Sequence, residues 1–292
     1  MNNDRIILFS NIWRDIGYET AGKVGRILRE HGRRVIFCPV CVEPPSDSPV
    51  PPPPLGLKSS ILEDVIDYAE MIITFGGDGT ILRAARVSAE KNVPILGINM
   101  GGKGFMAELE QDELGKISSI AAGKYKIEQR MMLDVELIRE NKAIHDDFAL
   151  NDVHIRGAGK VIGLTLSCDN QVIFQYTGDG VVIATPTGST AYSLSAGGPI
   201  VEPTADNIIV TPICAHALET KPFVLMSNRN VSVEIGFSKH SPAQISVDGC
   251  KGIDIQIGDT VNVKKSTKHT SLVRLTSRSF YHNISEKLGG RV

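Results

Sequence analysis

The chain has 292 residues, a length that fits two domains or one large domain at roughly 150 residues per domain. Hydrophobic residues make up 42 % of it and the formal net charge is −2, so the composition predicts a packed core and argues against general binding to nucleic acid or to a membrane surface. No apolar run approaches the roughly 18 residues of a membrane span, and the first apolar run, at 6–9, is too short for a signal-peptide core, so we expect a cytoplasmic protein.

The first half of the chain alternates between strand-like and helix-like segments. Uninterrupted apolar runs predict buried strands, and apolar residues spaced three or four apart predict helices. The expected strands are 5–9, 34–38, 71–75 and 93–98, and the expected helices are 15–31, 59–70, about 80–90 and 112–122. This alternation predicts an α/β first domain, residues 1–127, with a parallel sheet covered by helices on both faces.

From about residue 125 onward, short β-type runs dominate. They are separated by turn residues such as Asp169-Asn170 and Asp248-Gly249. The expected strands are 132–139, 143–150, 161–168, 172–176, 231–235, 244–247 and 260–264. We therefore predict a second, β-rich domain over residues 128–271.

A proline-dense stretch, 39–54, interrupts the first half and predicts a loop, because proline removes backbone donors and fixes φ. Cys38 and Cys41 form a C-x-x-C at its start. The pair is either a redox pair, half of a zinc site, or two reduced thiols near a strand end. No second C-x-x-C is present to complete four zinc ligands, so we favour reduced thiols and expect no protein-bound metal.

The turn Gly76-Gly77-Asp78-Gly79-Thr80 stands between a buried strand and a helix. Such a turn points backbone N–H groups and the positive end of the helix at one spot, which suits a phosphate, and glycine lets a ligand approach the backbone closely. We therefore interpret Gly76, Gly77 and Thr80 as phosphate-binding. Arg83, one turn further on, either meets a phosphate or faces solvent.

Asp78 is unusual in this turn, because a carboxylate beside a phosphate is repulsive unless it has a task. It could orient an attacking hydroxyl and accept its proton, or bind a metal through water. The structural alternative is an Asp that caps the following helix. The turn resembles an element shared by NAD kinases, lipid kinases and phosphofructokinases, so it indicates phosphoryl transfer without selecting the acceptor.

Two later segments bear on the acceptor. Asn151-Asp152 either recognises hydroxyl and amide groups or forms an Asx turn between strands. Residues 185–199 place many hydroxyls among small residues, a pattern that suits hydrogen bonds to sugar and base edges around a flat ring. The isolated histidines His154 and His216 are more readily explained as structural or surface residues than as ligands.

The order G-G-D-G-T, then N-D-V, then G-D-G-x-x-x-A-T-P-T-G-S-T-A-Y-S-x-S-A-G-G-P is similar to the NAD kinase family, and matching motifs extend over residues 71–250. The resemblance implies an α/β domain plus a β-sandwich-like domain, with a C-terminal tail, about 272–292, that returns to the first domain. It implies transfer of the γ-phosphoryl group of ATP, carried with a divalent metal such as Mg²⁺, to the 2′-hydroxyl of the adenosine ribose of NAD. It also implies a homodimer or homotetramer, and some bacterial members accept polyphosphate.

By the same resemblance, Asp78 is the general base. Asp179 lies near the nicotinamide end of NAD, and a set of residues from 190 onward lines the adenosine pocket. The substrate-binding residues implied in this way are Gly79, Asn151, Asp152, Asp179, Thr190, Ala191, Tyr192, Ser193 and Ser195.

Three positions depart from the common family pattern. Thr177 stands where many members have Arg, Cys250 where many have Gln, and Lys103 where Leu is common. These departures bear on donor and cofactor preference; Lys103 either reaches a phosphate or is solvated on its turn. Two other functions are considered. One is a kinase of another acceptor such as a lipid, which leaves residues 185–199 unexplained. The other is a non-catalytic NAD sensor, which would require Asp78 or the glycines of the turn to be degraded, whereas all are present.

Overall fold

The computed structural model describes residues 4–40, 51–102, 104–159, 161–216, 220–238, 243–276 and 280–289. Cys41, Lys103 and residues 41–50 of the proline-rich stretch lie outside these ranges. The chain forms two compact units: unit 1 is Met1–Gln129 with Thr270–Val292, and unit 2 is Arg130–His269. Among the described residues, no helix is long and apolar enough to cross a membrane.

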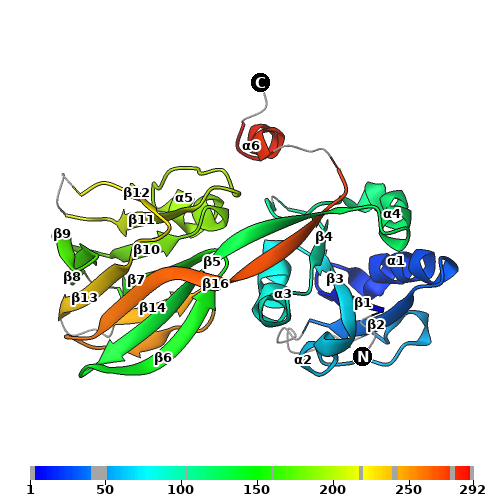
Figure 1. Cartoon of the computed structure of the whole chain (residues 1–292), viewed down its shortest axis with the longest axis horizontal. Helices are drawn as coiled ribbons and strands as arrows, with labels where there is room; N and C mark the ends of the chain where they lie inside the picture. The colour runs from blue at the N-terminus through cyan, green and yellow to red at the C-terminus, as the bar shows by residue number, and fades with distance from the viewer. Residues whose placement is uncertain are drawn as a thin grey trace. The chain divides into compact units, whose positions relative to one another are not determined.

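Unit 1 is built on a parallel sheet (Figure 1). Its strands pair in the order β2 (Arg34–Pro39), β1 (Arg5–Ser10), β3 (Ala69–Gly76) and β4 (Ile95–Asn99). Leu272, near the end of β16 (Thr260–Arg274), pairs in parallel with Ile95 and extends this sheet. The strands are almost entirely buried, as expected for a sheet covered on both faces.

The helices of unit 1 follow the predicted alternation. They are α1 (Glu19–Glu30), α2 (Leu62–Val65), α3 (Asp78–Lys91), α4 (Ile117–Ala121) and α6 (Phe280–Leu288), with 3-10 turns at Ile16–Tyr18, Pro54–Gly56, Ile66–Tyr68 and Gln111–Lys116. Gly76 at the end of β3 pairs with Asn99 at the end of β4. The two glycine-rich turns that follow these strands therefore begin side by side at the carboxyl edge of the sheet, where ligands bind in open α/β sheets.

The helix predicted over 59–70 is wrong in its length. Leu62 and Ile66 are buried, as its helical spacing requires, but Ile61 is 60 % exposed and Ala69 already pairs with Arg5 in the sheet. The chain must be extended to enter β3 at Ala69, so the helical segment is limited to α2 and one 3-10 turn.

Unit 2 is β-rich. One sheet is antiparallel, in the order β12 (Phe223–Met226), β11 (Asn207–Ile213), β10 (Gly180–Ala184), β7 (Asp152–Gly157), β14 (Ala243–Val247) and β15 (Ile253–Ile255). The other strands of the unit are β8 (Ile162–Cys168), β9 (Gln171–Gly178), β13 (Val231–Ser238), β6 (Lys142–Ala149), and the parts of β5 (Lys126–Arg139) and β16 that fall in unit 2. The α/β plus β-rich fold class predicted from the sequence is confirmed.

The two faces of β7 have different surroundings. Val153 and Ile155 point into the main core of unit 2, together with buried residues of β8, β10, β13 and β14. Strand geometry then places Asp152, His154 and Arg156 on the opposite face. On this opposite face, a smaller cluster packs the short helix α5 (Tyr192–Ser195) against β10 and β11.

Candidate active site

The turn after β3 leads directly into the N-terminus of α3. Gly77 is the N-cap residue of α3, and its carbonyl accepts the N–H of Thr80 at 2.9 Å. A Cβ added to Gly76 would lie 2.1 Å from the Thr80 Oγ1, so only glycine fits there. A Cβ at Gly77 or Gly79 would meet no such atom within 4 Å. The last two glycines therefore leave open space beside the N-terminus of a 14-residue helix.

Asp78 is the first residue of α3, and it does not cap that helix, because Gly77 occupies the cap position. Its carboxylate instead accepts N–H groups from the loop after β4, from Phe105 at 2.8 Å and from Met106 at 3.2 Å. A Cβ at Gly104 would lie 2.7 Å from the Asp78 Oδ1. Two backbone donors thus fix the orientation of this carboxylate at the helix N-terminus.

The second glycine-rich turn supports this loop. Gly101 and Gly102 have φ of +96° and +99°, which favours glycine. The buried Asn99 donates its Nδ2 to the Gly102 carbonyl at 3.3 Å and to the Glu110 carboxylate at 2.9 Å. Arg83 lies exposed on α3, so its predicted contact with a phosphate stays a prediction.

In unit 2, Asn151 ends the turn that leads into β7. Its N–H donates to the Asp248 carboxylate at 2.8 Å, and its carbonyl accepts the N–H of Thr185 at 2.9 Å. The residue is 8 % exposed, and its side-chain Oδ1 is buried with no hydrogen-bond partner within the chain. A buried carbonyl oxygen left in this way is suited to accept a hydrogen bond from a ligand.

Asp152 follows directly and is buried. Its Oδ1 lies 3.7 Å from the Nδ1 of His154, too far for a hydrogen bond. The His154 ring also meets the Tyr192 ring edge to face, with centroids 5.0 Å apart. The His154 ring therefore lies between Asp152 and Tyr192, a predicted adenosine-pocket residue.

Thr185 shows that the hydroxyl-rich segment is engaged internally. Its Oγ1 donates to the Leu150 carbonyl at 2.6 Å and accepts the N–H of Gly188 at 3.1 Å. A Cβ at Gly188 would lie 2.0 Å from the Asn151 carbonyl oxygen. The segment therefore packs directly on the backbone that carries Asn151.

Three more hydroxyls of the segment have partners in the protein. Ser189 donates to the Pro186 carbonyl at 2.6 Å, Ser193 shares a bond of 2.9 Å with Thr211, and Thr187 accepts from Arg130 at 3.1 Å. All three are buried. Ser193 was predicted to line the adenosine pocket; its hydroxyl is shared with Thr211, and its carbonyl accepts the N–H of Gly198 at 2.8 Å, so that role stays a prediction.

The remaining predicted residues of the segment are more accessible. Thr190, Ala191 and Tyr192 are half-buried, and Ser195 is exposed. The Thr190 hydroxyl makes one long bond, 3.3 Å to the Thr187 carbonyl. Within this segment, these four are the predicted residues whose side chains are not fully buried.

Asp179 lies between β9 and β10. Its N–H donates to the Ile213 carbonyl at 3.0 Å, and its carboxylate is hydrogen-bonded to the Cys214 thiol, which raises the pKa of that thiol. The positive charge of Arg156 has the opposite, weaker effect on the Cys214 pKa. Asp179 therefore belongs to a small polar group at the end of the sheet that also contains β7.

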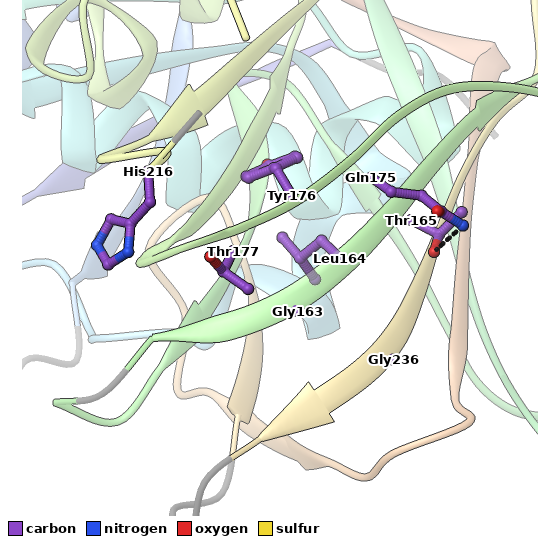
Figure 2. Close-up of a pocket in the computed structure, with 8 residues that line it drawn as sticks. All are labelled: Gly163, Leu164, Thr165, Gln175, Tyr176, Thr177, His216 and Gly236. Carbon is purple, nitrogen blue, oxygen red and sulfur yellow. Dashed lines mark hydrogen bonds between the residues drawn. The ribbon is translucent and has the colours of Figure 1, made fainter. Parts of the chain in front are cut away.

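Two surface hollows lie in unit 2. One, of about 430 Å³, is lined by residues of β7, β14 and the turn after β14, among them His154, Arg156, Ser246 and Cys250. The other, of about 490 Å³, is lined by β8, β9, Gly236 and His216, and Figure 2 shows the side chains of Thr177 and His216 near each other at one end of it. None of the predicted substrate-binding residues lines either hollow, although two positions that depart from the family pattern do, Cys250 in the first and Thr177 in the second.

Within the described ranges, no group of three or more His, Cys, Asp or Glu residues is arranged to hold a metal ion. Cys38 is buried, and this burial raises the pKa of its thiol to about 12. A thiol of this kind is inert at neutral pH, which agrees with the reduced-thiol interpretation for Cys38. Cys41 lies outside the described residues.

The structure also reveals a residue that the sequence analysis treated only as a turn. Asp248 accepts hydrogen bonds from three consecutive backbone N–H groups, those of Leu150, Asn151 and Asp152. In the sequence, Asp248-Gly249 looks no different from the turn Asp169-Asn170. The signal that separates them is a contact across roughly one hundred residues, which no local pattern records.

Two protein-family models match the chain. The model described as the ATP-NAD kinase N-terminal domain matches residues 8–125, and the ATP-NAD kinase C-terminal domain matches residues 150–275. Together they span most of the 292 residues. The chain belongs to the ATP-NAD kinase family. The family predicted from the G-G-D-G-T, N-D-V and hydroxyl-rich motifs is thereby confirmed, and with it the assignment of the chain as a kinase.

Relatives named NAD kinase agree with this membership. A protein named NAD kinase from Natranaerobius thermophilus is 38 % identical over 286 residues, 97 % of each chain. Another named NAD kinase, from Acetivibrio thermocellus, is 40 % identical over 238 residues, 80 % of this chain and 82 % of that one.

Solved structures of NAD kinases share the fold. The yeast NADH kinase, crystallised with NADH, superposes with a TM-score of 0.85 at 27 % identity, covering 98 % of this chain and 87 % of that one. An NAD kinase from Archaeoglobus fulgidus, solved in complex with ATP, gives a TM-score of 0.72 at 23 % identity, covering 97 % and 98 %. At this lower identity the second match speaks for the fold alone.

Proposed function

We propose that this member of the ATP-NAD kinase family transfers the γ-phosphoryl group of ATP to the 2′-hydroxyl of the adenosine ribose of NAD, giving NADP and ADP. The observation that carries the proposal is the carboxylate of Asp78, fixed by the N–H groups of Phe105 and Met106 at the start of α3. A carboxylate oriented in this way, beside a turn suited to phosphate, matches the needs of phosphoryl transfer to a hydroxyl.

Asp78 acts as the general base. As the bond between the ribose oxygen and the γ-phosphorus forms and the bond to the ADP oxygen breaks, the carboxylate takes the hydroxyl proton. The transition state of phosphoryl transfer is loose, so the proton moves late and a carboxylate of ordinary basicity suffices. Orientation of the hydroxyl is then the main contribution of Asp78 to the rate.

The open turn binds phosphate. Gly77 and Gly79 leave space beside the helix N-terminus, while Gly76 and Thr80 pack against each other and hold the turn in shape. Arg83, on the same helix, adds positive charge for the phosphates.

A divalent metal, Mg²⁺ in this proposal, enters as part of the donor substrate and neutralises charge on the phosphate oxygens of ATP. The described residues offer no cluster of ligands that would hold it independently of the nucleotide.

The acceptor is recognised by unit 2. The unpartnered Oδ1 of Asn151 accepts a hydrogen bond from an N–H donor of NAD, for which the adenine amino group has the right chemistry. Tyr192 offers an aromatic face for the adenine ring. The other proposed contacts are Gly79, Asp152, Asp179, Thr190, Ala191, Ser193 and Ser195. The relationship to a yeast kinase crystallised with NADH supports a dinucleotide as acceptor.

The test is NADP formation from NAD and ATP with Mg²⁺, followed by an NADP-specific readout. We expect the native chain to make NADP and Asp78→Asn to lose about 10²- to 10⁴-fold in kcat, the usual contribution of a general base. Asp64→Asn is the matched control, because Asp64 is also a first-turn carboxylate of a unit 1 helix and is exposed. It should keep the native rate.

The outcomes separate the three functions. Native chain that binds NAD without making NADP would point to a sensor. A chain that neither binds nor converts NAD would require a screen of other hydroxyl acceptors, including lipids. An Asp78→Asn variant with native kcat would remove the general-base role while leaving the kinase assignment intact.

We extend the proposal to donor range, assembly and location. Inorganic polyphosphate in place of ATP tests the donor, and light scattering on the purified chain tests the proposed homodimer or homotetramer. A cytoplasmic location is testable by fractionation. Each is independent of the role of Asp78.

A further inference from the structure

The carboxylate of Asp248 accepts hydrogen bonds from one short stretch of backbone, residues 150–152. Its Oδ2 accepts the N–H of Leu150 at 2.8 Å, and its Oδ1 accepts those of Asn151 at 2.8 Å and Asp152 at 3.1 Å. The N–H of Asp248 itself donates to the Asp152 carbonyl at 2.9 Å. Four hydrogen bonds therefore connect one residue to three consecutive residues that lie about a hundred positions earlier in the chain.

Asp248 combines a left-handed backbone conformation with a buried carboxyl group. Asp248 has a φ of +49°, in the left-handed region that side chains other than those of Gly, Asn and Asp rarely adopt. Burial raises the pKa of its carboxyl to about 6, against the three N–H groups that lower it, and the nearby charge of Asp152 raises it further. A buried carboxylate with a raised pKa is more typical of functional sites than of ordinary turns.

These hydrogen bonds constrain the backbone of Asn151. With its N–H held by Asp248, its carbonyl held by Thr185, and Gly188 packed against that carbonyl, its backbone has no free group left. The side-chain Oδ1 alone is buried and without a partner in the chain. Asp248 thus accepts one of the hydrogen bonds that fix the backbone from which that side chain projects.

We propose that Asp248 is a positioning residue for the acceptor: it sets the backbone of residues 150–152 and thereby orients the side chains of Asn151 and Asp152 that meet NAD. The inference rests on the proposed function, since it concerns the same acceptor. Asp248 acts through Asn151 and Asp152 and need not touch NAD. Its loss should therefore raise the KM for NAD while sparing the KM for ATP.

Asp169 provides a matched control within the same unit. It also has a positive φ, +48°, in a turn between two strands, and its carboxylate also accepts a backbone N–H, that of Asn230 at 3.0 Å. It is further paired with Arg229 at 2.9 Å. No hydrogen bond of Asp169 among the described residues reaches residues 150–152.

The experiment compares Asp248→Asn with Asp169→Asn. Asn tolerates positive φ and keeps the size of the side chain, but one acceptor oxygen becomes an NH₂ group that faces a backbone donor. We expect Asp248→Asn to raise the KM for NAD by about tenfold or more, the usual worth of a hydrogen bond to a charged group. The kcat and the KM for ATP should stay close to native, and Asp169→Asn should leave all three constants close to native.

A pH profile of the native chain supplies a readout that does not depend on any variant. Protonation of Asp248 removes one acceptor oxygen, so the KM for NAD should rise as the pH falls through about 6. The charged group that faces Asp248 is the Asp152 carboxylate, and His154 lies next to Asp152 on β7. In Asp248→Asn the rise near pH 6 should be absent, whereas it would persist if His154 were its source.

Several results would overturn the inference. These are a native KM for NAD in Asp248→Asn, an equal rise in both Asn variants, or a fall in kcat with the KM unchanged. If Asp248→Asn does not fold, a KM for NAD of the native chain that is flat from pH 7 to pH 5 would also reject it. Native chain that makes no NADP at all rejects the proposed function instead, so the two failures are distinguishable.

Discussion

The two glycine-bearing segments of this chain use glycine for opposite purposes. In the turn Gly76–Thr80 of unit 1, Gly77 and Gly79 have open space where a side chain would be. In residues 185–199 of unit 2, a Cβ at Gly188 would lie 2.0 Å from the Asn151 carbonyl oxygen, and one at Gly198 would lie 2.3 Å from the Ser193 Oγ. Gly77 and Gly79 keep room for a ligand, whereas Gly188 and Gly198 are packed against their own chain.

The hydroxyl groups show the same difference. Four buried hydroxyls of residues 185–199 are satisfied by Leu150, Pro186, Thr211 and Arg130. The density of hydroxyls in this segment suggested a sugar-binding surface. Most of its buried hydroxyls instead stabilise the protein's own backbone and side chains near Asn151. Ligand recognition is left to a few groups, above all the unpartnered Oδ1 of Asn151.

The largest expected effect comes from adding a methyl group at Gly188, where residues 185–199 pack against Asn151. Gly188→Ala should destabilise the protein by about 3 kcal/mol or more, at the upper end of overpacking costs, because the clash is with backbone that cannot rotate away. Any folded fraction should bind NAD weakly, since Asn151 must shift. Urea unfolding and NAD titration measure the two effects.

Gly77→Ala is the matched change in the open turn. Its φ of −103° and ψ of −168° are extended backbone that alanine adopts freely, and nothing stands within 4 Å of the added methyl. We expect stability within about 1 kcal/mol of native, as for ordinary surface changes, with a raised KM for ATP. A stable Gly188→Ala, or a strongly destabilised Gly77→Ala, would contradict the distinction between the two segments.

The next largest effect concerns the carboxylate of Asp248, which accepts hydrogen bonds from the backbone of residues 150–152. The folded-state pKa of Asp248, about 6, lies above the 3.8 of an unperturbed carboxyl. Between these values the folded chain holds a proton that the unfolded chain has lost, so the contribution of Asp248 to stability falls as the pH rises from about 4 to about 6.

The measurement is the free energy of unfolding of the native chain minus that of Asp248→Asn, as a function of pH. Other titrating groups cancel in this difference. We expect the difference to become less favourable to the native chain by a few kcal/mol over that window, since each pKa unit corresponds to about 1.4 kcal/mol. A difference that is constant with pH would show that the carboxyl titrates normally.

The sequence predicted the architecture and the family because both are recorded in local patterns. Buried strands such as β3 are uninterrupted apolar runs, and the G-G-D-G-T turn stands where a strand meets a helix. It did not predict the partners of Asp78 or of Asp248, because the N–H groups of Phe105 and Leu150 that meet them lie 27 and 98 residues away. The overlong helix at 59–70 has a related cause, since its end is set by pairing of Ala69 with β1.

The smallest effect separates two hydroxyls of the same segment. Thr185→Val removes a buried Oγ1 that donates to the Leu150 carbonyl and accepts from Gly188, leaving both groups unsatisfied, and should cost about 1–3 kcal/mol in the free energy of unfolding. Thr190→Val removes only a half-buried hydroxyl with one 3.3 Å bond, so it should cost less than about 1 kcal/mol. The two variants should also differ in how they affect NAD binding. Thr190 is proposed to touch NAD directly, whereas Thr185 supports the backbone of Asn151. Thr190→Val should therefore raise the KM for NAD in a protein of native stability. If Thr185→Val gave that same result, residues 185–199 would bind NAD through hydroxyls that are hydrogen-bonded within the protein, against the proposal.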